Sequence, residues 1–156
     1  MAEGEFALVQ EYLEIAINKT AAWVGEHDIY AMLADVAVQQ RDGTSLQKYA
    51  PLAEEFASRY DHQLYQAIAH RAWGVMYRLT GQYAESNIRL EQASKIFQKM
   101  NTRWQIGRTL FELGELSISR ADVSTARDHF TRALSAFETL GALPDAARTR
   151  EKLELT

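Results

Sequence analysis

The sequence predicts an all-α fold of about eight antiparallel helices, stacked pair upon pair. The main observation is a register of forty residues that recurs three times. The equivalent positions are Leu33-Ala34, Trp73-Gly74 and Leu113-Gly114; Ala53, Ala93 and Ala133; Ala57, Phe97 and Phe137; and Tyr60, Met100 and Leu140. A fixed period between about twenty and fifty residues indicates a unit that buries its apolar face by stacking on copies of itself. The composition also favours helices, because the 156 residues include only two prolines and eight glycines.

The first four helices are expected over 6–24, 28–40, 44–60 and 62–80. The first helix shows the three-and-four spacing of one buried stripe. Its apolar-face positions are Phe6, Val9, Leu13, Ala16, Ile17, Thr20 and Trp23. Gly25 ends this helix, and Arg41-Asp42-Gly43 closes the second. Thr44 or Ser45 is expected to cap the third helix, and Pro51 is expected to kink or restart it, because proline removes a backbone hydrogen bond.

The other four helices are expected over 83–100, 103–120, 123–140 and 144–155. Gly81 precedes the first of them, and Asn101-Thr102 follows it. Asp122 caps the third and Gly141 ends it, while Pro144 fits the first turn of the last. The forty-residue register sorts all eight into two types. The A type comprises 28–40, 62–80, 103–120 and 144–155, and the B type comprises 6–24, 44–60, 83–100 and 123–140.

One repeat domain, residues 1–156, is therefore expected. Its parts are a half repeat over 5–25, repeats over 27–61, 62–101 and 103–141, and a C-terminal capping helix over 144–155. The order begins on a B helix and ends on an A helix. This order is expected if the chain is a segment of a longer array or of a multidomain protein. The alternative for the last helix is that it is a native cap.

Two glycines lie in the middle of predicted A helices. Gly74 and Gly114 each cost about 1 kcal/mol relative to alanine there. We expect close approach of the partner B helix to offset this cost, with Ala93 and Ala133 on the facing side. Large side chains fill the remaining volume, namely Trp73, Tyr77, Phe97, Leu113, Phe130 and Phe137. A ligand-stacking role for Trp73 is the alternative, but repeat positions favour core packing.

These positions resemble a known repeat pattern. The residues that carry it are His70, Trp73, Gly74, Tyr77, Gly81, Tyr83, Ser86, Leu90 and Ala93, then Leu110, Leu113, Gly114, Ala126, Phe130 and Ala133. They resemble the tetratricopeptide repeat, although the period is forty and Gln98 and Glu138 replace the closing proline. The copy around Tyr30, Leu33, Ala34 and Ala37 matches weakly. The stretch 137–148 resembles long-repeat arrays of bacterial signalling proteins, which often follow an ATPase, cyclase or transcription-activator module.

The resemblance implies a right-handed superhelix whose A helices line a concave groove for an extended peptide or a helix. The groove positions it implies are Asp35, Val38, Gln39, Arg71, Val75, Arg78, Arg108, Phe111, Glu115, Ile118 and Arg148. The Lys and Asn with which some members bind a peptide carboxylate are not reproduced, because positions 75 and 115 hold Val and Glu.

The arginines of the A helices suggest a second hypothesis. Arg71, Arg78, Arg108 and Arg148 are expected to form a basic strip for an acidic partner segment, since the guanidinium suits carboxylate or phosphate. The alternative is a solvated face with local pairs such as Arg108–Glu112. Exposure of Phe111 and Ile118 would favour an interface.

Other functions are not expected. Residues 1–66 carry 4 basic and 11 acidic side chains and residues 67–156 carry 13 and 10, which is too weak a basic excess for nucleic-acid binding. The sequence has no cysteine, no secretory segment and no apolar run long enough to span a membrane. A cytoplasmic protein without a membrane span is therefore expected. His27, His62, His70 and His129 lack metal-site spacing, with His70 expected to be structural. No catalytic motif, metal or cofactor is predicted.

The first helix has no A helix before it, so its stripe Phe6, Val9, Leu13 and Ile17 is expected to be partly uncovered. A preceding repeat of a longer parent, or a second copy in a homodimer, would cover it.

Two function classes remain open. One is an interaction scaffold in a larger cytoplasmic signalling protein, and the other is a sensor that binds a small effector or signalling peptide in the groove. A closed, aromatic-lined pocket would favour the sensor and an open channel the scaffold.

Overall fold

The computed structural model describes residues 3–19 and 26–156, and this part of the chain is entirely helical outside its turns. Its helices are α1 Glu3–Lys19, α2 Glu26–Gln40, α3 Gly43–Arg59, α4 Gln63–Leu79, α5 Tyr83–Lys99, α6 Arg103–Ser119, α7 Val123–Leu140 and α8 Leu143–Glu154. The predicted fold class is confirmed, and each expected helix is present. Thr20, Trp23 and Gly25, to which the end of the first helix was assigned, lie outside the described residues.

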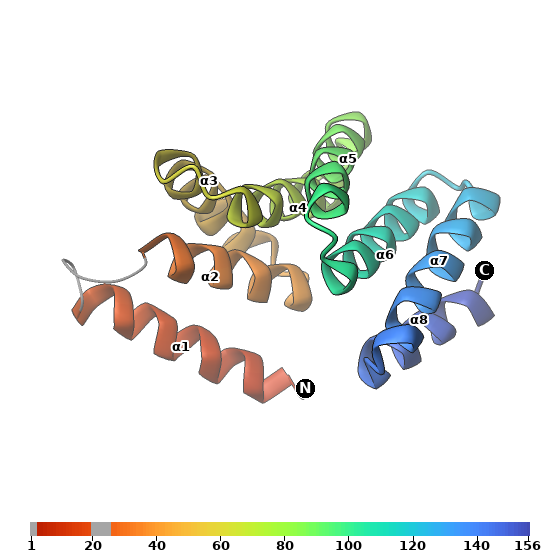
Figure 1. The fold of residues 1–156 in the computed structure, drawn as a ribbon, viewed down its shortest axis with the longest axis horizontal. Helices are drawn as coiled ribbons and strands as arrows, with labels where there is room; N and C mark the ends of the chain where they lie inside the picture. The colour runs from red at the N-terminus through yellow and green to blue at the C-terminus, as the bar shows by residue number, and fades with distance from the viewer. Residues whose placement is uncertain (1–2, 20–25) are drawn as a thin grey trace.

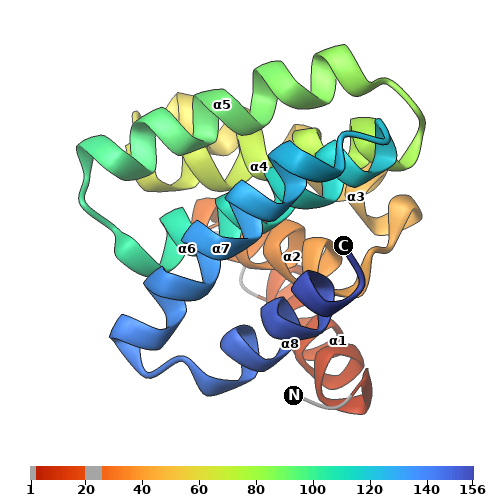
Figure 2. The same ribbon diagram turned by 90° about the vertical axis from the view of Figure 1, so that its right-hand side faces the viewer.

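The helices pack on one another in chain order and curve into an arch (Figure 1). Helices α2, α4 and α6 lie on the inside of the arch, and α3, α5 and α7 lie on the outside, so these six helices of the predicted A and B types form two layers. Helices α1 and α8 lie at the two feet of the arch, and the turned view also places them near each other (Figure 2). The curvature therefore brings the first and last helices, α1 and α8, to one opening.

The period of forty originates in turns that recur every twenty residues. Each turn has one residue in the left-handed region, and these residues are Arg41, Asp61, Gly81, Asn101, Ala121 and Gly141. In each turn the next residue donates its backbone N–H to the carbonyl five residues earlier, as Gln82 does to Tyr77 at 2.8 Å. This is the hydrogen bond of the Schellman helix end. Identical turns give every helix hairpin the same length, which allows the hairpins to stack.

Only two of these six positions hold glycine, which adopts positive φ without steric cost. We expect Gly81→Ala (φ +78°) to lose about 1 kcal/mol of unfolding free energy. Gly43→Ala is the matched control, because Gly43 also has open space around it but lies at the start of α3 without positive φ. Urea denaturation of both variants measures the difference. An equal response of the two variants would contradict the turn geometry.

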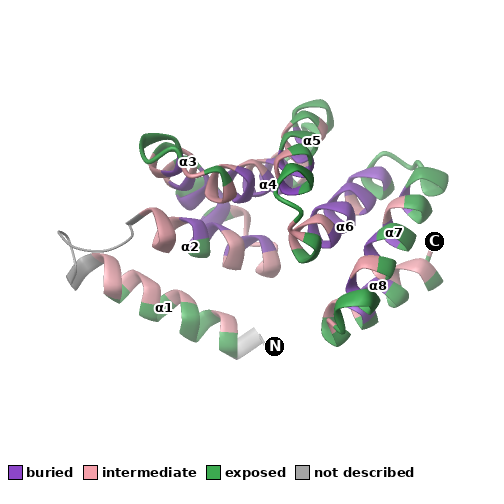
Figure 3. Cartoon of the chain, viewed as in Figure 1, coloured by how far each residue is buried: buried purple, intermediate pink, exposed green. Residues whose placement is uncertain are grey.

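Three clusters of buried residues form the core along the facing sides of the helices (Figure 3). The mid-helix glycines lie in tight contacts, as expected, but with different partners. A Cβ on Gly74 would lie 2.6 Å from Leu90 Cγ, and one on Gly114 would lie 2.5 Å from Phe130 Cε1. The partners are thus three residues before the predicted Ala93 and Ala133. Gly107 has the same relation to Phe137, at 2.9 Å, which the sequence analysis did not predict.

The remaining packing predictions concern Trp73, Tyr77, Pro51 and His70. Trp73 and Tyr77 pack against the first core cluster, with ring centroids 5.4 Å apart, which agrees with core packing. Helix α3 continues through Pro51 without a restart. His70 is half-buried and lies 2.8 Å from Arg89 through its Nδ1 atom, so its structural role agrees with the prediction.

The apolar stripe of α1 is partly uncovered, as expected. Leu13 and Ile17 pack against the first core cluster, and Phe6 is half-buried. Val9 alone of the four predicted positions is exposed. The other large apolar side chains exposed on the described part of α1 are Leu8, Tyr12 and Ile15. The predicted stripe is therefore mainly the side by which α1 packs on the rest of the chain.

Candidate functional site

An open groove of about 1140 Å³ lies between α1 and α8, with α2 and α6 below it. Its lining residues are Phe6, Ala7, Gln10, Glu11, Glu14, Asp35, Val36, Gln39, Gln40, Asp42, Trp104, Arg108, Pro144, Asp145 and Arg148. Asp35, Gln39, Arg108 and Arg148 are the predicted groove residues that line it. Helix α1 supplies one wall of this groove. The groove is therefore narrower than the predicted one, which was lined by the A helices alone.

The other predicted groove residues lie elsewhere. Arg71, Val75 and Phe111 are buried, as is Val38, so none of them offers a surface to a partner. Arg78 and Glu115 are largely buried in ion pairs with Glu112 and Lys152. Ile118 is exposed, but it does not line this groove. The buried positions were assigned wrongly, because Val38, Val75 and Phe111 belong to the hydrophobic core clusters and Arg71 pairs with Asp35.

Asp35 of α2 holds two buried arginines beneath the groove. Arg71 of α4, which is fully buried, donates to its Oδ1 at 2.8 Å, and Arg108 of α6 donates to its Oδ2 at 2.7 Å. Burial alone would raise the pKa of Asp35, but the charges of Arg108 and Arg71 outweigh it and hold that pKa below its ordinary value. One carboxylate thus joins three A helices.

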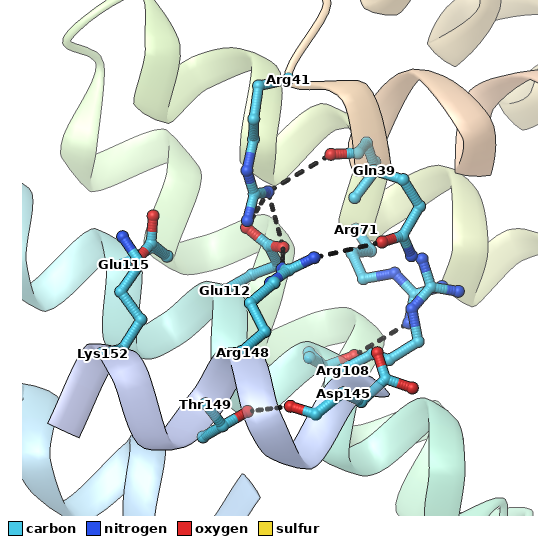
Figure 4. Close-up of polar contacts among 12 residues, drawn as sticks. Gln39, Arg41, Arg71, Arg108, Glu112, Glu115, Asp145, Arg148, Thr149 and Lys152 are labelled. Carbon is cyan, nitrogen blue, oxygen red and sulfur yellow. Dashed lines mark hydrogen bonds and ion pairs between the residues drawn. The ribbon is translucent and has the colours of Figure 1, made fainter. Parts of the chain in front are cut away.

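Glu112 of α6 holds three further arginines, of which Figure 4 shows Arg41 and Arg148 beside it. Arg41 approaches its carboxylate to 2.6 Å, Arg78 to 3.4 Å and Arg148 to 3.9 Å. The Glu112 side chain is only 4% exposed. Burial would raise its pKa, but the arginines, Arg41 foremost, hold the pKa below its usual value. The predicted local pair Arg108–Glu112 does not form, since Arg108 turns to Asp35 instead.

The two carboxylates and five arginines form what we call the arginine network: Asp35, Glu112, Arg41, Arg71, Arg78, Arg108 and Arg148. It contradicts both a basic strip of four free arginines and the alternative of a solvated face, because Arg71 and Arg108 are 0% and 5% exposed and are already paired. Its positive charge exceeds its negative charge by three. Burial and, next, the charge of Arg108 lower the pKa of Arg71 to about 10. The network is thus short of negative charge.

The α1 wall of the groove is acidic and is tied to α3. Glu14 accepts a hydrogen bond from Tyr49 and lies 3.6 Å from Lys48. The hydrogen bond from buried Tyr49 lowers the pKa of Glu14. Asp42 caps α3 by accepting from the backbone N–H groups of Thr44 and Ser45 at 3.0 and 3.2 Å.

The opposite wall combines an aromatic ring with charge. Trp104 donates its Nε1–H to Asp145 at 3.0 Å, which connects α6 with α8. The guanidinium of Arg108 lies 4.7 Å from the Trp104 ring centroid, and that of Arg148 lies 4.0 Å from the Phe111 ring centroid. These ring contacts fix both arginines at the floor of the groove.

The pairing of Arg41 with Glu112 was not predicted from the sequence. Arg41 lies in a turn, and its partner Glu112 is 71 residues away. Glu112 carried one usable signal, because the register aligns it with Ala72, which is fully buried. A carboxylate at a buried repeat position requires cationic partners.

The described residues contain neither a metal-binding cluster nor a membrane-spanning helix. Within residues 3–19 and 26–156, no group of three His, Asp or Glu side chains is placed to hold a metal ion. The rings of His27 and His62 come within 5.8 Å of each other, a proximity that sequence spacing does not show. None of the helices described here is both long and apolar enough to cross a membrane.

Comparison with known proteins adds no relative. No protein-family model, no curated protein and no solved structure matches this chain.

Proposed function

We propose that this chain is a non-catalytic interaction scaffold of the tetratricopeptide type, which binds an extended segment or a helix of a partner protein in the groove between α1 and α8. The observation that supports it is the groove itself. At about 1140 Å³ it exceeds the roughly 300–1,000 Å³ of ordinary small-molecule pockets, and it is open to solvent. Four helices contribute polar and apolar side chains to it, as a peptide site requires.

The groove supports a scaffold better than a small-molecule sensor. In the described chain, Phe6 and Trp104 are the aromatic residues that reach it, and they do not enclose it. The resemblance to bacterial long-repeat arrays supports a place in a larger cytoplasmic signalling protein. A second copy bound through α1 remains a proposal, with Leu8, Tyr12 and Ile15 as its exposed apolar contacts in place of Leu13 and Ile17.

A groove-filling substitution tests this proposal. Val36 is half-buried on the groove floor, so Val36→Arg places a long charged side chain where the partner segment would lie. We expect random peptides selected on the wild-type chain to share a sequence pattern and to bind Val36→Arg at least about tenfold more weakly, since interface-centre substitutions cost 1–2 kcal/mol or more.

The control for that experiment is Ile88→Arg on α5, whose side chain is exposed and does not line the groove. Circular dichroism confirms that both variants fold. Selection without any common pattern, or equal binding by Val36→Arg and the wild type, would count against a groove-binding scaffold.

A further inference from the structure

The surplus charge of the arginine network reaches solvent mainly at α8. Arg71, Arg78 and Arg108 are at most 9% exposed, whereas Arg148 is 38% exposed and lines the groove. Arg41 is 27% exposed but belongs to the turn after α2 and does not line the groove. A ligand in the groove therefore meets this surplus at Arg148, with Arg108 directly below.

Arg148 is also the arginine with the weakest partner. Its ion pair with Glu112 is 3.9 Å long, beyond hydrogen-bond distance, while Arg41 occupies the same carboxylate at 2.6 Å. Of the other carboxylates nearby, Glu115 pairs with Lys152 at 2.9 Å, and Asp145 accepts a hydrogen bond from Trp104 at 3.0 Å while its charge still acts on Arg148 from beyond ion-pair distance. Donors of the Arg148 guanidinium thus lack a close anionic acceptor among the described residues.

Gln39 cannot satisfy both arginines of the floor. With its amide in one orientation, Oε1 accepts from Arg148 Nη1 at 3.3 Å. With the amide turned, Oε1 accepts from Arg108 Nε at 2.9 Å, and the hydrogen bond from Arg148 Nη1 is lost. The second orientation has the shorter hydrogen bond and leaves Arg148 Nη1 without the Gln39 oxygen. An anionic acceptor in the groove would bind Arg148 and the Gln39 NH₂ group together.

We propose that Arg148, with Gln39 beside it and Arg108 beneath it, binds a side-chain carboxylate of the segment held in the groove. This inference rests on the proposed scaffold function and specifies one contact of it. A planar carboxylate fits the fork of a guanidinium with two parallel hydrogen bonds. Phe111 holds that fork in place from one face, since its ring centroid is 4.0 Å from Arg148 Cζ.

A single negative charge suits this position better than a phosphate. Asp35 and Asp145 line the groove near Arg148 and repel a dianion about twice as strongly as a carboxylate. The α1 wall carries Glu11, Glu14 and Asp42, which repel any anion from the other side. An acidic side chain of the partner is therefore confined to the α8 side.

Three immobilised peptide libraries test the proposal on the full chain. Their peptides share random flanking residues and have a fixed central Glu, Gln or phosphoserine. We expect the wild type to be retained about tenfold more strongly by the Glu library than by the Gln library, because a charge-assisted hydrogen bond to arginine is lost in the latter. Arg148→Gln should reduce this ratio to about one.

Arg150→Gln is the matched control. Arg150 lies on the same helix, but it pairs with Glu138 at 2.5 Å outside the groove, so its substitution should preserve the Glu/Gln ratio. Equal retention on Glu and Gln peptides would overturn the carboxylate site and leave the scaffold standing. Stronger retention on phosphoserine would overturn the choice of carboxylate. Absence of retention on every library would overturn the scaffold together with the site.

Discussion

Glu112→Gln should lower the free energy of unfolding by about 3 kcal/mol, since removing one side of a buried ion pair leaves charge without compensation. Glu112 is 4% exposed and is the shared partner of Arg41, Arg78 and Arg148. Glutamine keeps the shape and one acceptor oxygen but loses the charge. Arg41 and Arg148 can turn partly toward solvent, whereas Arg78 is 9% exposed and cannot.

Equilibrium denaturation in urea measures this loss, and Glu138→Gln is its control. Glu138 pairs with Arg150 at 2.5 Å, but both side chains are about half exposed. A solvent-exposed pair contributes at most about 1 kcal/mol. Similar losses in the two variants would show that the charge of Glu112 is not held in a buried network.

The same comparison at falling pH gives a second readout. The pKa of Glu112 and that of Asp35 are lower in the folded than in the unfolded chain. Their contribution is therefore complete above the unfolded values of about 4 and is lost as pH falls through the lower folded values. Glu112→Gln should flatten this acid-side decline, because one of the two groups no longer titrates.

The fold was predictable because its signal is local and repeated. Helix ends were marked by residues such as Gly81, Asn101 and Gly141, which occupy the left-handed turn positions. The forty-residue register then placed the buried Ala53, Ala93 and Ala133 at equivalent sites without knowledge of the curvature.

The site was less predictable because it depends on how strongly the stack curves. Arg71 meets Asp35 across 36 residues, and Arg41 meets Glu112 across 71 residues. Neither of these separations along the sequence follows from the forty-residue period, since a flatter superhelix would expose the same arginines to solvent. The position of α1 beside the groove likewise depends on tertiary packing, so Gln10 and Glu14 could not be recognised as lining residues.

The second large effect is expected at Phe130. Its ring is fully buried, and Phe130→Ala should cost about 3–5 kcal/mol through lost burial and the cavity left behind. The ring lies where a Cβ on Gly114 would be, with Phe130 Cε1 2.5 Å from that position. Gly114→Ala alone should therefore destabilise the wild type, because overpacking of about 1–3 kcal/mol exceeds the gain of about 1 kcal/mol in helix propensity.

The two substitutions should be coupled. In the Phe130→Ala background the obstructing ring is gone, so Gly114→Ala should become stabilising by about 1 kcal/mol. Phe97→Ala provides the control background, because Phe97 is equally buried but belongs to a different core cluster from Phe130. There Gly114→Ala should remain destabilising. If Gly114→Ala had the same effect in all three backgrounds, the close approach of α6 and α7 would not explain why glycine occupies this position.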